Sequence, residues 1–196
     1  MNQCIKSMKE ALVSYHQKAK KADEAINKAR SEYKPEVAQE RIERIETELK
    51  QERTKTLDII MKASEQGKAE IKKRYELNPS DITDDAKLLQ SGFPMNQADF
   101  DKMCSKYENN GTMCRILAEY AETRNKKVQA LHPKEVFPEG YLHTMNLPNE
   151  KAMMDKYDRL VSSAEGIINS MDGHGWGKGV NDPFVVASVE GFGERN

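Results

Sequence analysis

The residues best suited to chemistry form a glycine-rich segment near the C-terminus. From Gly173 to Gly179 the sequence reads GHGWGKG, which superficially resembles a phosphate-binding loop. Such a loop follows a strand and carries a Ser or Thr directly after its Lys, so that the hydroxyl can reach magnesium. This segment lacks the hydroxyl residue and the spacing, and it follows a predicted helix. We therefore interpret it as a flexible hinge and expect no nucleotide cofactor.

Two histidines could be considered as metal ligands. His132 and His143 flank Glu135 and Glu139, but their spacing matches no helical ligand pair and is much wider than that of known zinc sites. The sequence therefore predicts no metal ion at these positions.

The other reactive side chains have structural explanations. The carboxylate pair Asp84 and Asp85 falls in the first turn of a predicted helix, where negative charge is favourable. No Ser or Cys lies in a recognisable nucleophile motif, and no dinucleotide fingerprint follows a strand. We therefore predict that the chain is not an enzyme and uses no cofactor.

A DNA-binding helix-turn-helix is the next alternative. Two predicted helices meet around Glu108–Gly111, and the second carries Arg115, Lys126 and Lys127. Acidic residues alternate with these cations, whereas a helix that reads DNA needs a cationic footprint. The formal net charge of the chain is only −1. Binding to nucleic acid is therefore not expected.

The strongest pattern in the sequence is the spacing of apolar residues near the N-terminus. Apolar residues recur at alternating steps of three and four from the N-terminus, which is the heptad spacing of a helix that pairs with another helix. The members of this seam are Ile5, Met8, Leu12, Tyr15, Ala19, Ala22, Ile26, Ala29 and Tyr33. We predict that these residues mediate helix pairing.

A second long helix is predicted from Pro35 to about Leu77, and it would complete a helical hairpin. Proline suits the first turn of a helix because its missing N–H needs no partner there. The stretch Lys6–Lys34 carries eight basic and four acidic residues, whereas Glu36–Glu52 carries six acidic and three basic ones. This complementarity favours pairing, although a solvated charged face explains it equally well. The second seam is interrupted at Arg53, Ser64 and Gly67.

Shorter helices are predicted in the next segment. We expect them at Asp84–Ser91, Gln97–Tyr107, Thr112 to about Leu131, and Asn149 to Met171, with Thr83, Asn96 and Thr112 as N-caps for the first three. Proline residues between 133 and 148 predict an irregular connection before the last helix.

The segment after Met171 is predicted to be an extended, non-helical tail. Six of the 11 glycines lie between Gly173 and Gly193, and the stretch NDPFVVA reads as a short apolar strand. Trp176, Phe184, Val185 and Val186 are candidates for docking on a neighbouring subunit or partner. Folding back on the chain's own helices, or remaining mobile, is an equally good interpretation.

Composition limits the class of protein. Leu, Ile, Val and Phe account for 36 of 196 residues, which indicates a modest core, and 32% of residues are charged. No apolar run is long enough to cross a membrane, and the first residues do not form a signal peptide. The three cysteines are far apart, so we expect buried free thiols in a soluble, intracellular protein.

Two stretches resemble a known class of proteins. These are LLQSGFPMNQADFDKMCSKYENNGTMCRILAEYA, residues 88–121, and YKPEVAQERIERIETELK, residues 33–50. Together they are similar to segments of small helical structural and assembly proteins of tailed bacteriophages and prophages, over about a quarter of the chain. The resemblance implies a phage-derived structural or assembly role, and it assigns no residue a function.

The sequence thus predicts an all-α protein in three parts. These are a helical hairpin or coiled coil at residues 1–77, a small bundle of short helices with a C-terminal packing helix at 78–171, and a flexible Gly-rich tail at 172–196. The expected function is self-association, as a homo-oligomer, and docking to other phage or host proteins, in the host cytoplasm or on the virion and without membrane contact. The alternative is a small phage regulator that inhibits a host protein or binds nucleic acid. Oligomer number and the direction of helix pairing stay open.

Overall fold

The computed structural model describes residues 2–172 and 179–194. Helices make up 75% of the structure, and the described part contains no strand, so the predicted all-α fold is confirmed. The chain forms two compact units. Unit 1 comprises Met1–Lys68 together with Asp155–Asn196, and unit 2 comprises Ala69–Met154. None of the described helices is long and apolar enough to span a membrane.

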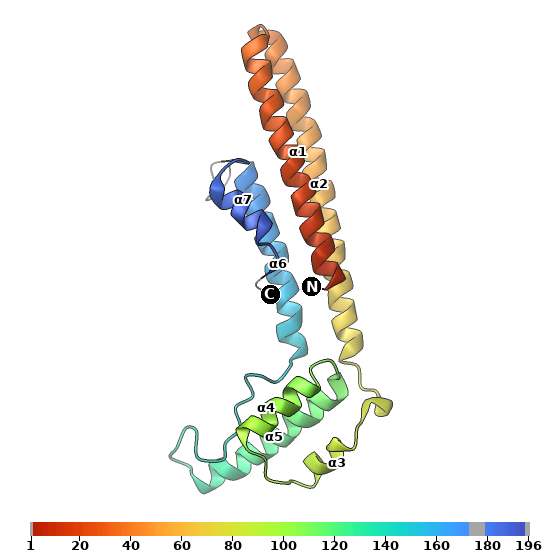
Figure 1. Cartoon of the computed structure of the whole chain (residues 1–196), viewed down its shortest axis with the longest axis vertical. Coiled ribbons are helices and arrows are strands. Elements are labelled where there is room, and N and C mark those ends of the chain that lie inside the picture. Colours follow the sequence, from red (N-terminus) through yellow and green to blue (C-terminus); the bar gives the residue numbers. More distant parts are fainter. Residues whose placement is uncertain (1, 173–178, 195–196) are drawn as a thin grey trace. The chain divides into compact units, whose positions relative to one another are not determined.

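Unit 1 is built on a long helical hairpin. Helices α1 (Gln3–Glu32) and α2 (Pro35–Arg74) run antiparallel, side by side (Figure 1). Asn2 caps α1, because its Oδ1 accepts a hydrogen bond from the Cys4 N–H at 2.8 Å. Pro35 is the first residue of α2, as its missing N–H favours. The predicted hairpin is therefore present, and its two helices pair in the antiparallel direction.

A third helix, α6 (Glu150–Met171), packs on the hairpin at the positions that interrupt the seam of α2. A Cβ atom on Gly67 would overlap the ring of Tyr157, so the missing side chain is what lets this ring approach. Arg53 Nη2 donates to Asn169 Oδ1 at 2.5 Å, and Lys68 forms an ion pair with Asp158. Two of the three interruptions, Arg53 and Gly67, are therefore contact points for α6.

The extended tail is the part of the prediction that is wrong. Residues Pro183–Glu190 form a helix, α7, instead of the apolar strand expected at 181–187. Asp182 caps it by accepting from the Phe184 N–H at 2.9 Å, and α7 lies against α1. In a helix, residues four apart share a face, which lets Val185 and Val189 be buried together. A strand would need an edge to pair with, and the described chain offers none.

Unit 2 contains the short helices. They are α3 (Asp85–Gln90), α4 (Gln97–Lys106) and α5 (Gly111–Leu131), close to the predicted ranges, together with a 3-10 helix that was not predicted, η1 (Pro79–Asp81). Figure 1 shows α4 beside α5. The core between them is made of Ala86, Leu89, Met95, Phe100, Cys104, Tyr107, Met113, Leu117, Tyr120, Ala121 and Leu142. These buried side chains pack α3, α4 and α5 together.

Two of the predicted caps are wrong. Asn110, and not Thr112, caps α5, since its Oδ1 accepts from the Met113 N–H at 2.9 Å. Thr112 instead accepts from the Asn78 N–H at 3.0 Å. Thr83, expected to cap α3, shares a hydrogen bond with the Tyr107 hydroxyl at 2.8 Å. Both threonines form hydrogen bonds with residues distant in the sequence, and capping rules consider only neighbouring residues.

The expected cap of α4 is confirmed. Asn96 Oδ1 accepts from the Asp99 N–H at 2.8 Å. Gly111, at the start of α5, packs directly on the backbone of Tyr75, where a Cβ atom would overlap the Tyr75 Cα. The end of α2 therefore sets where α5 begins.

Candidate interaction surfaces

The residues considered for chemistry do not converge in the structure. Of the glycine-rich segment 173–179, only Gly179 is described, with a φ of 108°. His132 lies 3.3 Å from a carboxylate oxygen of Glu135, and both side chains are exposed. Among the described residues, no group of three or more His, Cys, Asp or Glu side chains could hold a metal ion.

The carboxylate pair at the start of α3 is engaged in ordinary contacts. Asp85 accepts hydrogen bonds from Lys106 Nζ at 2.7 Å and from the Tyr107 hydroxyl at 2.6 Å. The Lys106 contact, followed by the one from Tyr107, holds the pKa of Asp85 below its usual range. Asp84 pairs with Lys87 at 2.8 Å. Asp85 therefore stays ionised and ties α3 to α4, which is not the state of a general acid.

The cysteines are buried, as expected for free thiols that pack as small hydrophobic groups. Burial raises the pKa of Cys104 to about 11 and also raises that of Cys114. Cys114 donates its S–H to the Tyr107 carbonyl at 3.1 Å. Since the thiolate is the reactive form of cysteine, both thiols of unit 2 are held unreactive at neutral pH.

A partly buried group of three polar side chains joins three helices of unit 1. The Tyr15 hydroxyl donates to Asp172 Oδ1 at 2.9 Å, and Arg53 Nη1 lies 3.4 Å from Asp172 Oδ2. Burial, followed by the neighbouring Asp172 charge, raises the pKa of Tyr15. Because Asp172 is paired on both oxygens, this group fixes α6 against α1 and α2.

The predicted seam is buried unevenly along α1. Its residues nearer the N-terminus are largely buried, and Tyr15 is only 1% exposed. Met8, Leu12, Ala19 and Ala29 are also buried, whereas Ile5, Ala22 and Ile26 are half-buried and Tyr33 is exposed. The seam thus runs from a well-covered half of the hairpin to a half with open sides.

The tail-docking residues are divided between inside and outside. On α7, Val185 is fully buried, Val186 is half-buried, and Phe184 is 61% exposed. Trp176 lies outside the described residues. Val185 therefore packs inside its own chain. Among the described residues predicted to dock on a partner, Phe184 is the one with a largely exposed side chain.

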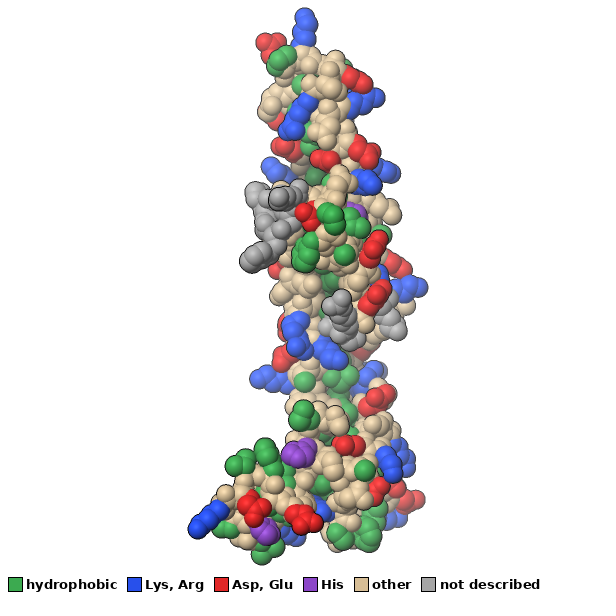
Figure 2. All heavy atoms as spheres, turned by 60° about the vertical axis from the view of Figure 1, so that its left-hand side comes forward, with side chains coloured by type: hydrophobic (Ala, Val, Ile, Leu, Met, Phe, Trp, Pro, Cys, Tyr) green, Lys and Arg blue, Asp and Glu red, His purple; other side chains and the backbone are tan. Residues whose placement is uncertain are grey.

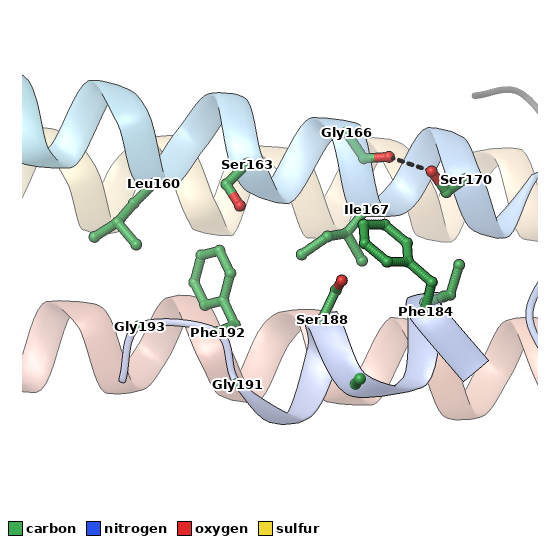
Figure 3. Close-up of a pocket in the computed structure, with 12 residues that line it drawn as sticks. Leu160, Ser163, Gly166, Ile167, Ser170, Phe184, Ser188, Gly191, Phe192 and Gly193 are labelled. Carbon is green, nitrogen blue, oxygen red and sulfur yellow. Dashed lines mark hydrogen bonds between the residues drawn. The ribbon is translucent and has the colours of Figure 1, made fainter. Parts of the chain in front are cut away.

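Phe184 lies at a groove between α6 and α7. Figure 3 shows the rings of Phe184 and Phe192 extending from the α7 side, and Leu160 and Ile167 extending from α6. The groove has a volume of about 520 Å³, and its other lining residues are Ser163, Gly166, Ser170, Val185, Ala187, Ser188, Gly191 and Gly193. None of these residues is charged, so the groove has no charged group with which to hold an ion or perform acid–base chemistry.

The end of the hairpin near its turn is open on two sides. One side, the inner groove, continues from the end of α6 and is lined by Ala19, Ala22, Ile26, Leu49 and Met171, among others. The other side, the outer groove, includes no residue of α6 or α7. It has a volume of about 720 Å³ and is lined by Ala25, Lys28, Ala29, Tyr33, Val37, Glu40, Arg41, Arg44, Ile45 and Glu48. Figure 2 shows basic and acidic side chains interspersed along the hairpin.

Unit 2 exposes a set of large apolar side chains on the connection before α6. Val136, Phe137 and Met145 are 76%, 63% and 91% exposed. The Phe137 ring packs against Tyr141 and His143, with centroid distances of 5.4 and 5.1 Å. We call these five residues the loop cluster. Figure 2 shows hydrophobic side chains at the surface of this unit.

Side-chain amides hold the connection that carries the loop cluster. Asn125 on α5 donates to the Leu142 carbonyl at 2.9 Å and accepts from its N–H at 2.8 Å. Gln97 on α4 pairs with the backbone of His143 in the same way, at 3.0 and 2.8 Å. From its Pro and Gly residues this stretch was predicted only to be an irregular connection, and no sequence pattern marks the amide pairs. The loop cluster is therefore displayed on a fixed backbone.

Comparisons with known proteins add no relative. The chain matches no protein-family model, no curated protein and no solved structure.

Proposed function

We propose that this chain is a non-enzymatic, phage-type structural or assembly protein that acts by self-association and by docking to partner proteins. The observation that carries the docking role is the loop cluster of unit 2, whose apolar side chains are largely exposed on a backbone pinned by Asn125 and Gln97. Exposed apolar groups that are already ordered favour binding, because little conformational entropy remains to be lost.

The chemistry of the described residues agrees with this role. The titratable groups considered above are engaged in structural pairs, as with Asp172 and Asp85, or are buried thiols. The phage context rests on the resemblance of residues 33–50 and 88–121 to phage structural and assembly proteins. Self-association is supported by the open sides of the hairpin.

Mass spectrometry of intact, purified phage particles tests the structural role. We expect many copies of the chain per particle. A chain that is produced in the host but absent from particles would overturn the structural proposal and favour the regulator alternative.

A pair of matched variants tests the docking surface. Phe137→Ser combined with Met145→Ser removes two large apolar groups of the loop cluster, and we expect this variant to be depleted from particles. Leu77→Ser is the control, because Leu77 is 65% exposed in unit 2 but lies outside the cluster. Equal incorporation of both variants, with unchanged helicity, would contradict docking through this cluster.

Light scattering after size exclusion tests self-association. We expect a mass above that of the 22.3 kDa monomer, rising with concentration. A strict monomer over a wide concentration range would contradict this part of the proposal.

A further inference from the structure

The outer groove of the hairpin is a surface formed by α1 and α2 alone. It includes no residue of α6 or α7, whereas the inner groove ends at Met171 and Asp172 of unit 1. Tyr33 and Val37 are 37% and 43% exposed in it. A partner could therefore lie along this face without meeting the helices that pack on the other side.

One exposed apolar side chain lies on this face beyond the groove. Ile59 is 49% exposed and lies about three turns of α2 from Glu48, so both residues share one side of the helix. The face from the hairpin turn to Ile59 is about 35 Å long and about 18 Å wide. If two copies pack through this face, each copy buries it once, and the total area removed from solvent is about 1,300 Å². This area is at the lower end of the range for specific interfaces.

The charges of the hairpin end are divided between its two helices. Residues 18–34 carry six basic and three acidic side chains, and residues 35–52 carry three basic and six acidic ones. Within residues 18–52, all of which the structure describes, Lys18–Glu52 is the ion pair that joins α1 to α2. The other ion pairs there, such as Lys28–Glu32 and Arg44–Glu48, lie within one helix. The complementarity of the two helices is thus largely unused inside one chain.

The register of the hairpin shows which charges could meet across an interface. The Lys18–Glu52 pair marks two residues at the same level. One turn toward the hairpin turn, Lys21 lies level with Glu48, and about two turns further Lys28 lies level with Glu40. All four side chains are exposed. Lys28, Glu40 and Glu48 line the outer groove together with Arg41 and Arg44, and Lys21 lies two turns from Lys28 on the same side of α1. Lys28 and Glu48 would exchange their partners within one helix, Glu32 and Arg44, for partners on the second copy.

We infer that the outer groove takes a second copy of this chain, related by a two-fold axis that runs along the hairpin. In this arrangement α1 of each copy lies against α2 of the other, so Lys21 and Lys28 meet Glu48 and Glu40 of the second copy. A two-fold axis perpendicular to the hairpin would instead place α1 against α1, with basic residues facing each other. Flanking ion pairs of this kind select orientation and partner in helical bundles. The inference rests on the self-association proposed above and specifies its surface and symmetry.

Charge reversal provides the test. The variant Lys21→Glu with Lys28→Glu, and separately the variant Glu40→Lys with Glu48→Lys, are expected to weaken the dimer of the full chain at least about 10-fold in sedimentation experiments. Mixing the two variants is expected to restore a 1:1 heterodimer. The matched control, Lys20→Glu with Arg30→Glu, makes the same change of charge on α1 outside the outer groove and should leave the dimer intact.

A distance measurement tests the symmetry. Spin labels on Lys34→Cys, next to the hairpin turn, are expected within about 30 Å of each other in the dimer, because the two turns lie at the same end. A much longer distance would overturn the parallel two-fold axis.

The possible failures are distinguishable. A chain that is a strict monomer overturns both the proposed self-association and this inference. An oligomer that survives both charge reversals, or a mixture of the two variants that stays dissociated, overturns the outer groove as the interface and leaves self-association standing.

Discussion

The covered and open halves of the hairpin in unit 1 show what a third helix adds to one repeating pattern. In the half against which α6 and α7 pack, Met8 and Leu12 of α1 and Ile60 of α2 are 0% exposed. In the half near the turn, Ala22 and Ile26 continue the same heptad spacing but are only half-buried. Spacing alone therefore did not determine how deeply a seam residue is buried.

The same contrast explains the breaks in the seam of α2. Arg53 and Gly67 look like defects if α1 is the only partner of α2. They become contact points once α6 is present, because Arg53 binds Asn169 and Gly67 makes room for Tyr157. In the open half the apolar residues of α2 have no such third partner within the described chain, which leaves Val37 exposed.

The largest difference between the two halves is expected for identical truncations. Ile60→Ala removes a fully buried side chain and should lower the free energy of unfolding by about 3–4 kcal/mol, whereas Ile26→Ala, at a half-buried site, should cost about 1 kcal/mol. Urea unfolding followed by circular dichroism measures both. Equal losses would show that the two halves are covered to the same extent.

Glycine replacement should separate the contact with α6 from simple helix propensity. Gly67→Ala places a Cβ atom in the ring of Tyr157, and we expect a loss of about 2 kcal/mol despite the better helix former. Gly166→Ala is the control: it is also within a long helix, but its Cβ would meet nothing within 4 Å. It should gain about 0.5–1 kcal/mol. Calorimetric melting that shifts in the same direction for both variants would contradict the close contact at Gly67.

The polar link of the covered half should be sensitive to alkaline pH. Tyr15→Phe removes the hydrogen bond to Asp172 and should cost about 1 kcal/mol at neutral pH. The pKa of Tyr15 is higher in the folded protein than its ordinary value of about 10, so the unfolded chain loses this proton at a lower pH than the folded one. The stability that Tyr15 contributes is therefore present below pH 10 and is lost as the pH rises above 10.

Unit 2 should show the same direction of change. Burial raises the pKa of Tyr75 to about 12, so stability there should fall between about pH 10 and pH 12. Alkaline unfolding curves of the wild type, Tyr15→Phe and Tyr75→Phe measure these contributions. Curves of identical slope above pH 10 would refute the assignment of the effect to these two tyrosines.

The smallest effect is expected at the exposed boundary between the two halves. The Lys18 and Lys55 contacts lower the pKa of Glu52 to about 2. The stability contributed by Glu52 is therefore present above its ordinary pKa of about 4.5 and is lost as pH falls toward 2. Lys18→Gln should raise the pKa of Glu52 in an NMR titration, and high salt should do the same in the wild type. A Glu52 pKa that is unchanged by both treatments would show that the ion pair is absent in solution.

Much of the fold was predictable because helices are specified locally. The periodic apolar residues of α1, the proline at the start of α2 and the asparagine before α4 gave these elements close to their observed bounds. The loop cluster could not be predicted in the same way. Its arrangement depends on Asn125 and Gln97, which reach the backbone of residues 17 and 46 positions away, and no short-range pattern marks them.

The sequence by itself determined that the chain is helical, where its two longest helices lie, and that they bear opposite charge near their turn. These are properties of neighbouring residues, since helical hydrogen bonds and side-chain faces repeat within a few positions. Only the tertiary structure decided that residues 183–190 of the tail form the helix α7, that Gly67 admits Tyr157, and that no residue of α6 or α7 lines the outer groove. These features depend on the shapes of segments more than 80 residues apart along the chain, whose fit is settled by packing and not by local propensity.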